Sequence, residues 1–185
     1  PAAKRPRLLA TRLGASLDEL TAGELAGDPV RVVSGSVLSG RAAMGPRHGY
    51  LGRHHNQVTA LAEVDARRFL GWMAPGWSRY STTRLFLSSL KRALGGGPRF
   101  SFDTDLNGGR RAMVPTGAYD AVMPFEMMPV FLMRAVLAGD VEQAEALGCL
   151  ELIEEDVDLM SFVCASKIEH GPALREMLTT IEKEG

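Results

Sequence analysis

The chain has 185 residues, of which 45% are hydrophobic and 23% are charged, and its formal net charge is −1. This composition is that of an ordinary soluble globular protein, and the apolar stretch 123–133 is too short and too interrupted by Pro124, Glu126 and Pro129 for a membrane-spanning helix of roughly 20 residues. Two cysteines are too few for a secreted disulfide scaffold and favour a reducing cytoplasm.

Charge is divided unevenly along the chain. Residues 1–95 carry fourteen basic and six acidic side chains, whereas residues 96–185 carry seven and sixteen, so the two halves have net charges of +8 and −9. Such a distribution can hold the halves together or orient them toward partners of opposite sign. The arginines of the basic half are scattered and lack an aromatic stacking pattern, so we expect solvated surface and no nucleic-acid partner.

Residues 1–65 are predicted to form a small β-rich unit crossed by one helix. Residues 5–13 have the apolar content and brevity of a strand, residues 29–40 form a β-branched strand that runs into a Ser/Gly turn, and residues 56–64 alternate like a half-buried strand. A short helix is expected after Ser16, an N-cap residue, because Glu19 stands three positions later, as in a capping box.

Residues 66–123 are predicted to be a mixed connecting region. Residues 81–94 have the apolar spacing of a helix, which the GGGP sequence at 95–98 ends. Residues 99–106 alternate again before the NGG turn at 107–109. The prolines and glycine that follow, up to residue 124, indicate an extended loop.

Residues 124–185 are predicted to be a compact helical cluster. A first helix after Phe125 ends at Gly139, a second begins at the N-cap Asp140 and stops at Gly148, a third covers 154–164, and a fourth has Pro172 in its first turn. The face of the first helix that should be buried consists of Met128, Phe131, Leu132, Ala135 and Val136. The methionines that we expect to fill the core are Met123, Met127, Met128 and Met133.

Three histidines, His48, His54 and His55, lie within eight residues and are a candidate metal site. Metal binding needs three convergent imidazoles, or two and a carboxylate, and no acidic residue occurs between Asp28 and Glu63. Adjacent residues of a strand point to opposite faces, so we favour a structural role and predict no metal site.

The turn SGSVLSG at residues 34–40 is the candidate ligand site. It follows a strand and offers backbone amides, so Ser34, Gly35, Ser36 and Gly40 are its candidate ligand-binding residues. It lacks the lysine of a P-loop and the G-x-G-x-x-G of a dinucleotide site, and tight-turn geometry also explains its glycines. The NGG turn could likewise aim Arg110 and Arg111 at an anion. No nucleophile elbow, H-E-x-x-H or Walker motif is present, so we predict no catalytic residue.

Cys149 and Cys164 bound a segment that can be compared with an iron–sulfur motif. Ligands of bacterial four-iron clusters follow the pattern C-x2-C-x2-C-x3-C-P. Here fourteen residues without a cysteine separate the two thiols, and Glu154 and Asp156 are poor substitutes for soft ligands. The segment therefore has the character of a ferredoxin-like helical framework without its cluster, in which both cysteines are packing residues.

Several stretches together resemble a known family. They are RVVSGSVLSG, GYLGRHHNQVTAL, FLGWMAPG, LNGGRRAMVPTGAYDAVMP, ALGCLELIEEDVDLMSFVC and GPALREMLTTIEKEG. In this order they look like the C-terminal part of the NqrA family, whose members are subunits of the Na+-translocating NADH:quinone reductases, and which is related to RnfC and to the NADH-binding subunit of respiratory complex I. The start at Pro1, without an initiator methionine or a signal-peptide core, fits a piece that lacks the N-terminal domains of an NqrA protein.

The resemblance implies an α+β fold. A β-grasp, ubiquitin-like SLBB domain (residues 1–65) would be followed by the connecting region and by a helical, ferredoxin-like domain without a cluster. It also implies a peripheral subunit on the cytoplasmic side of a bacterial inner membrane, in a translocase that couples electron transfer from NADH to ubiquinone with sodium transport. FMN, FAD, riboflavin and iron centres would lie on partner subunits and none on this chain, and the membrane subunit NqrB would be its chief partner.

Three functional hypotheses follow. The first is a cofactor-free docking part of an NqrA subunit that serves assembly of the respiratory complex. The second is a small-molecule module that binds a quinone at the 34–40 turn or in a cleft between domains. The third is an electron carrier that uses Cys149 and Cys164 as a dithiol, which we disfavour because the pair is not C-x-x-C and has only Lys167 nearby as an activating base.

Overall fold

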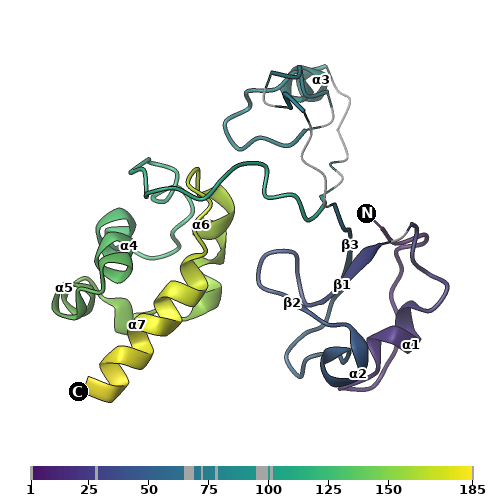
Figure 1. Cartoon of the computed structure of the whole chain (residues 1–185), viewed down its shortest axis with the longest axis horizontal. Coiled ribbons are helices and arrows are strands. Elements are labelled where there is room, and N and C mark those ends of the chain that lie inside the picture. Colours follow the sequence, from purple (N-terminus) through teal and green to yellow (C-terminus); the bar gives the residue numbers. More distant parts are fainter. Residues whose placement is uncertain are drawn as a thin grey trace. The chain divides into compact units, whose positions relative to one another are not determined.

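The computed structural model describes residues 2–27, 29–64, 69–71, 73–77, 79–94, 100 and 102–184, except for the side chain of Arg92. The chain divides into two compact units, residues 1–105 and residues 106–185 (Figure 1). The first contains a small sheet and the second is helical, which confirms a mixed α and β architecture.

The first unit contains a three-stranded antiparallel sheet with the order β2-β1-β3. Strand β1 (Val30–Ser34) pairs with β3 (Val58–Ala62) over five residues and with the two-residue β2 (Arg41–Ala42). The predicted strands in 29–40 and 56–64 are therefore confirmed. The central strand is β-branched and almost wholly buried, as a strand between two neighbours should be.

Helix α1 (Leu17–Thr21) covers the small core of this unit. Its N-cap is Ser16, whose Oγ accepts a hydrogen bond from the backbone N–H of Glu19 at 3.4 Å, as the sequence predicts. The core consists of Leu17, Val32 and Ala43, with partly buried leucines around it. A one-turn helix, α2 (Gly45–His48), follows the sheet edge.

The predicted strand at residues 5–13 is wrong. This stretch belongs to no strand, it is exposed throughout, and Leu8 is 101% exposed. A strand is stable only when a neighbour pairs with its backbone. Among the described residues, the isolated bridge from Ala3 to Leu25 lies before this stretch and the bridge from Ser16 to Tyr50 lies after it.

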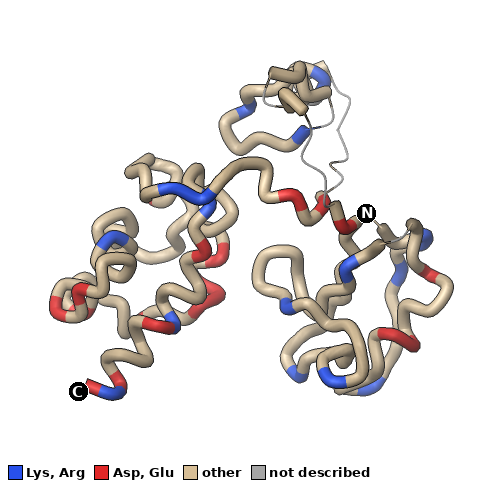
Figure 2. Tube along the Cα trace, viewed as in Figure 1, with Lys and Arg blue, Asp and Glu red and all other residues tan. Residues whose placement is uncertain are grey.

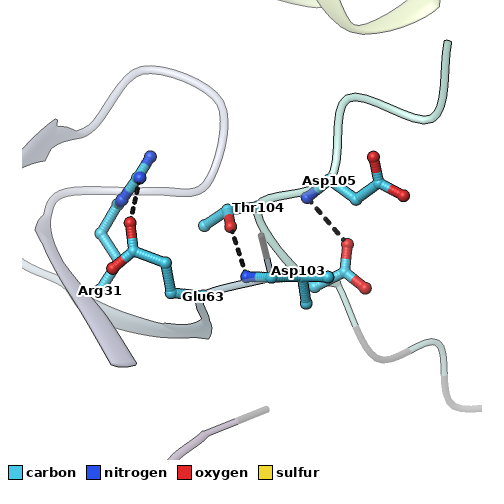
Figure 3. A network of polar contacts seen from close by, with 6 residues as sticks. Arg31, Glu63, Asp103, Thr104 and Asp105 are labelled. Carbon is cyan, nitrogen blue, oxygen red and sulfur yellow. Dashed lines mark hydrogen bonds and ion pairs between the residues drawn. The ribbon is translucent and has the colours of Figure 1, made fainter. Parts of the chain in front are cut away.

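Residues 103–105 return the chain to the end of β3 (Figure 3). The backbone N–H of Thr104 donates to the carbonyl of Ala62 at 3.2 Å, and Thr104 Oγ1 accepts from the N–H of Val64 at 3.0 Å. An ion pair between Arg31 and Glu63 braces the same end of the sheet. The intervening segment is thus a closed excursion whose two ends meet beside β3.

Within this excursion the predicted helix at residues 81–94 is shorter than expected. Helix α3 covers only Ser88–Ala93, and residues 81–87 are turns and irregular backbone. The GGGP stop and two residues of the alternating stretch at 99–106, Arg99 and Ser101, lie outside the described residues. The described residues of this stretch form no strand, and Asp103 makes a single parallel bridge to Ala62.

The second unit is built from short helices around one core. Its elements are α4 (Pro129–Ala138), α5 (Val141–Ala146), the 3-10 turns η1 (Cys149–Glu151) and η2 (Glu154–Val157), α6 (Asp158–Val163) and α7 (His170–Glu184). The N-cap at Asp140 is confirmed, since its carboxylate accepts from the N–H of Gln143 at 3.0 Å. Helix α4 ends at Gly139 with φ +73°, in the left-handed region that glycine favours.

The buried face of α4 differs from the prediction. Leu132, Ala135 and Val136 are buried as expected, but Met128 and Phe131 are 57% and 58% exposed, and Met133 is buried in their place. Every residue of α4 except Arg134 is apolar or proline, so periodicity alone does not distinguish its faces. Met123 and Met127 are partly buried against the core, which leaves Met128 as the exception among the predicted core methionines. Among the described residues, no helix has both the length and the apolar character that spanning a membrane requires.

Candidate functional site

The turn at residues 34–40 connects β1 to β2, and four of its backbone amides bond within the protein. Ser36 Oγ accepts from the N–H groups of Leu38 at 3.2 Å and Ser39 at 3.1 Å, and the N–H of Gly40 donates to the Ser36 carbonyl at 3.0 Å. The N–H of Gly35 donates to the carbonyl of Gln57 at 2.8 Å. An anion cradle needs free amide donors that converge on one point. Here the Ser36 hydroxyl accepts from two of the amides, so these two are not free to bind an anion.

Gly35 and Gly40 are explained by close approach. Gly35 has φ +103°, and a Cβ on it would lie 2.9 Å from Gly40 Cα and 3.2 Å from His55 Nε2. A Cβ on Gly40 would lie 2.3 Å from the Ser36 carbonyl oxygen and 2.4 Å from Val33 Cγ1. The glycines therefore close the turn, and this is the tight-turn interpretation that the sequence also allows.

Ser34 contacts His55, a pairing that sequence reasoning does not reveal. Ser34 Oγ lies 2.7 Å from His55 Nδ1 and accepts from the N–H of Gly52 at 2.8 Å. A serine beside an imidazole resembles a nucleophile and its base. Ser34 is fully buried, however, so a substrate cannot reach its hydroxyl. The pair fastens the 49–57 loop to the end of β1.

The three histidines do not converge. His48 and His54 are exposed, while His55 is half-buried against Ser34. No group of three or more His, Cys, Asp or Glu side chains suited to a metal ion occurs in the described ranges.

Arg110 and Arg111 are engaged inside the second unit. Arg110 forms an ion pair with Glu169, and Arg111 bonds the loop after α6 through its backbone N–H to the carbonyl of Ser166 at 3.2 Å. The guanidinium of Arg111 also donates to the carbonyl of Ala165 at 3.4 Å. These contacts connect the 106–117 loop to the loop between α6 and α7.

Cys164 lies in a buried polar cluster with Tyr119 and His170. Tyr119 Oη donates to Cys164 Sγ at 3.0 Å, and the N–H of Ile168 points to the same sulfur at 3.4 Å. The Tyr119 and His170 rings meet edge to face, with centroids 5.4 Å apart. Burial first, and then the cysteine, raise the pKa of Tyr119, so its hydroxyl stays a neutral hydrogen-bond donor. Sequence reasoning missed Tyr119, which stands in a predicted loop.

Cys149 is a separate buried thiol at the start of η1. It is fully buried, and burial together with the nearby Glu145 carboxylate raises its pKa. Reactive cysteines need a lowered pKa and access to solvent. Both cysteines are free thiols in the core, which favours packing over dithiol chemistry.

His170, in this cluster, and Asp158, at the start of α6, also have shifted pKa values. His170 is fully buried, neither ring nitrogen has a hydrogen-bond partner among the described residues, and burial lowers its pKa to about 4. Burial, and then the carboxylates of Glu155 and Glu154, raise the pKa of Asp158 to about 6. Asp158 begins α6 and His170 begins α7.

Comparison with known proteins gives matches along the whole chain. The family model described as the NQRA C-terminal domain, with an SLBB label, matches residues 1–45. The chain is 51% identical over 185 residues to the NqrA subunit of the Na(+)-translocating NADH-quinone reductase of Hahella chejuensis, covering 100% of this chain and 40% of that protein.

Two further relatives carry the same name. The protein from Klebsiella pneumoniae is 52% identical over 185 residues, which are 100% of this chain and 40% of that protein. The protein from Neisseria meningitidis is 52% identical over 182 residues, which are 98% of this chain and 39% of that protein. The chain thus spans about two fifths of the length of these relatives.

Proposed function

Since the chain belongs to the NqrA family of Na+-translocating NADH-quinone reductase subunits, we propose that it is a cofactor-free docking part of that membrane complex. The observation that carries the proposal is identity of about half of all residues over the whole chain. On this proposal the chain holds subunits together on the cytoplasmic side of the inner membrane, with the membrane subunit NqrB as its chief partner. Flavins and iron centres lie on the other subunits.

The surface of the helical unit supports docking. Phe125, Met128 and Phe131 are 45%, 57% and 58% exposed, and the last two line an open hollow of about 340 Å³ beside Pro115 and Asp120. The unit carries six basic and fourteen acidic side chains, and acidic positions lie on α5, η2 and α7 but not on α4 (Figure 2). Apolar side chains with charged residues around them are the usual composition of a protein interface.

The cysteine environment supports a role without a cluster. Cys164 accepts two hydrogen bonds inside the core, and Cys149 is buried with a raised pKa. On this proposal residues 124–185 are ferredoxin-like in framework and residues 1–65 are a β-grasp SLBB domain.

Co-purification tests the proposal. A tagged chain expressed with the other reductase subunits should retain them, and Phe131→Asp should reduce the recovered partner at least about tenfold if this hollow lies in the interface. Leu150→Asp, at a leucine that is 61% exposed on the same unit, is the matched control. Failure of the unsubstituted chain to retain any other subunit contradicts docking, and stoichiometric iron in the purified chain contradicts the cofactor-free assignment.

Quinone binding is the second candidate. The hollow beside Phe131 is apolar enough for a quinone ring, whereas the engaged amides at 34–40 count against the turn. Titration of the chain with a short-chain ubiquinone should then give saturable binding that Phe131→Ala weakens and Ser36→Ala does not. Non-saturable uptake contradicts this candidate.

A further inference from the structure

The excursion between β3 and Thr104 has an unusual composition. Between Asp65 and Asp103 the sequence contains no acidic residue and seven lysines and arginines. The same stretch is rich in Phe, Trp, Tyr, Leu and Met. The other long stretch without acidic residues, 29–62, carries four arginines and provides all three strands of the sheet. The excursion therefore combines the higher positive charge with a larger share of big apolar side chains.

Several large apolar side chains in the described part of this excursion are exposed. Phe69 is 92% exposed, Leu85 81%, Leu94 80%, Met73 64% and Trp77 62%. Isolated exposed leucines are ordinary on a protein surface, but so many within 26 residues mark an interaction site.

The described part of the excursion nevertheless has internal order. The N–H of Leu87 donates to the carbonyl of Pro75 at 3.0 Å, and the buried Ser88 donates through Oγ to the carbonyl of Arg79 at 2.6 Å. The guanidinium of Arg79 lies over the ring of Phe86, 5.8 Å from its centroid. The segment therefore makes internal contacts even though the apolar side chains named above are exposed.

We propose that the described residues within 69–94 bind the surface of an anionic lipid bilayer. Leu, Phe and Met side chains insert below the headgroups, Trp and Tyr lie at the headgroup level, and Lys and Arg attract anionic lipid. Trp77 and Tyr80 supply the aromatic groups, and Arg84 and Lys91 are exposed basic groups. The lack of acidic residues in this segment favours lipid over a protein partner, whose surface would carry charges of both signs. The inference rests on the proposed membrane-complex assembly for its setting, but it concerns direct contact with lipid.

Sedimentation with vesicles tests the proposal. The chain should bind vesicles of equal phosphatidylglycerol and phosphatidylcholine, bind pure phosphatidylcholine at least about tenfold less, and release at high salt. Binding should also shift tryptophan emission to the blue, and the shift should be reduced in Trp77→Phe. Equal binding to both vesicles, or to neither, overturns the proposal.

Two pairs of variants localise the contact. Phe69→Ser with Leu85→Ser should weaken vesicle binding about tenfold or more, whereas Leu8→Ser with Leu13→Ser, at leucines that are 101% and 74% exposed, should not. The double variant Arg84→Gln with Lys91→Gln should weaken vesicle binding about fivefold for each charge removed. The control, Arg41→Gln with Arg47→Gln at exposed arginines of β2 and α2, should not weaken it. Equal losses in the control variants overturn the assignment to this segment.

The outcome separates this proposal from the proposed function. If vesicle binding is absent but the reductase subunits are retained, lipid contact is wrong and docking stands. If Phe69→Ser with Leu85→Ser loses those subunits in detergent and vesicle binding is also absent, the segment binds protein instead and lipid contact is wrong. If vesicles bind but no other subunit is retained, the proposed docking fails alone.

Discussion

His170 and Asp158 have opposite effects on the stability of the helical unit as pH changes. The pKa of His170 falls from 6.5 to about 4 on folding, so stability is lost as pH drops from about 6.5 toward 4, where only the unfolded chain binds this proton. The pKa of Asp158 rises from 3.8 to about 6, so its contribution is fully present below about 3.8 and is lost as pH rises through 6. Between pH 4 and 6 the two effects partly cancel.

Asp158→Asn separates the two effects. The variant cannot ionise, so its free energy of unfolding relative to the unsubstituted protein should be higher at pH 7.5 than at pH 4. Urea titrations at both pH values, followed by circular dichroism, measure the difference. Glu151→Gln, at an exposed carboxylate of η1, is the control for the loss of one negative charge from the same unit. An equal change at both pH values would mean that folding does not shift the pKa of Asp158.

At the scale of elements, the turn between β1 and β2 requires glycine at position 40. Gly40→Ala places a methyl group within 2.4 Å of both the Ser36 carbonyl oxygen and Val33 Cγ1, so it should destabilise the sheet unit by about 1–3 kcal/mol. Ser39→Ala, at the exposed neighbour, should change stability by less than about 0.5 kcal/mol. Hydrogen exchange at the amides of Val32 and Val33 reports the local effect. Unchanged protection of these amides in Gly40→Ala would contradict the prediction, because it would mean that the turn accommodates the methyl group without loss of stability.

Local chemistry predicted the elements that depend on neighbours in sequence. Ser16 and Asp140 cap their helices, and the strands around Val32 and Ala60 lie where β-branched and alternating patterns place them. The wrong strand at residues 5–13 failed for another reason: its pattern is acceptable, but no described neighbour pairs with it.

The position of the candidate turn could be predicted from the sequence, but the contacts of its residues could not. The turn at 34–40 occurs where predicted, yet the contact that explains it joins Ser34 to His55, which is 21 residues away. Tyr119 and Cys164 are separated by 45 residues, and no local periodicity marks a tyrosine in a loop for burial. Contacts across such separations depend on tertiary packing, which a single sequence does not display.

At the scale of the whole molecule, the two units differ in charge and in core size. Residues 1–105 carry fifteen basic and eight acidic side chains, whereas residues 106–185 carry six and fourteen. The helical unit has a buried cluster of thirteen residues, and the sheet unit has one of three among the described residues. Hydrophobic stabilisation scales with buried apolar area, so the helical unit should be the more stable of the two.

Calorimetry should therefore show two unfolding transitions, with the sheet unit melting first. Leu132→Ala, at a fully buried position of α4, should lower the upper transition through a loss of about 2–5 kcal/mol and leave the lower one in place. Val32→Ala, on β1, should lower only the first transition through a loss of about 2 kcal/mol. Because the substituted side chains belong to separate cores, each variant is the control for the other. A single transition that both variants shift equally would mean that the two units unfold as one cooperative body.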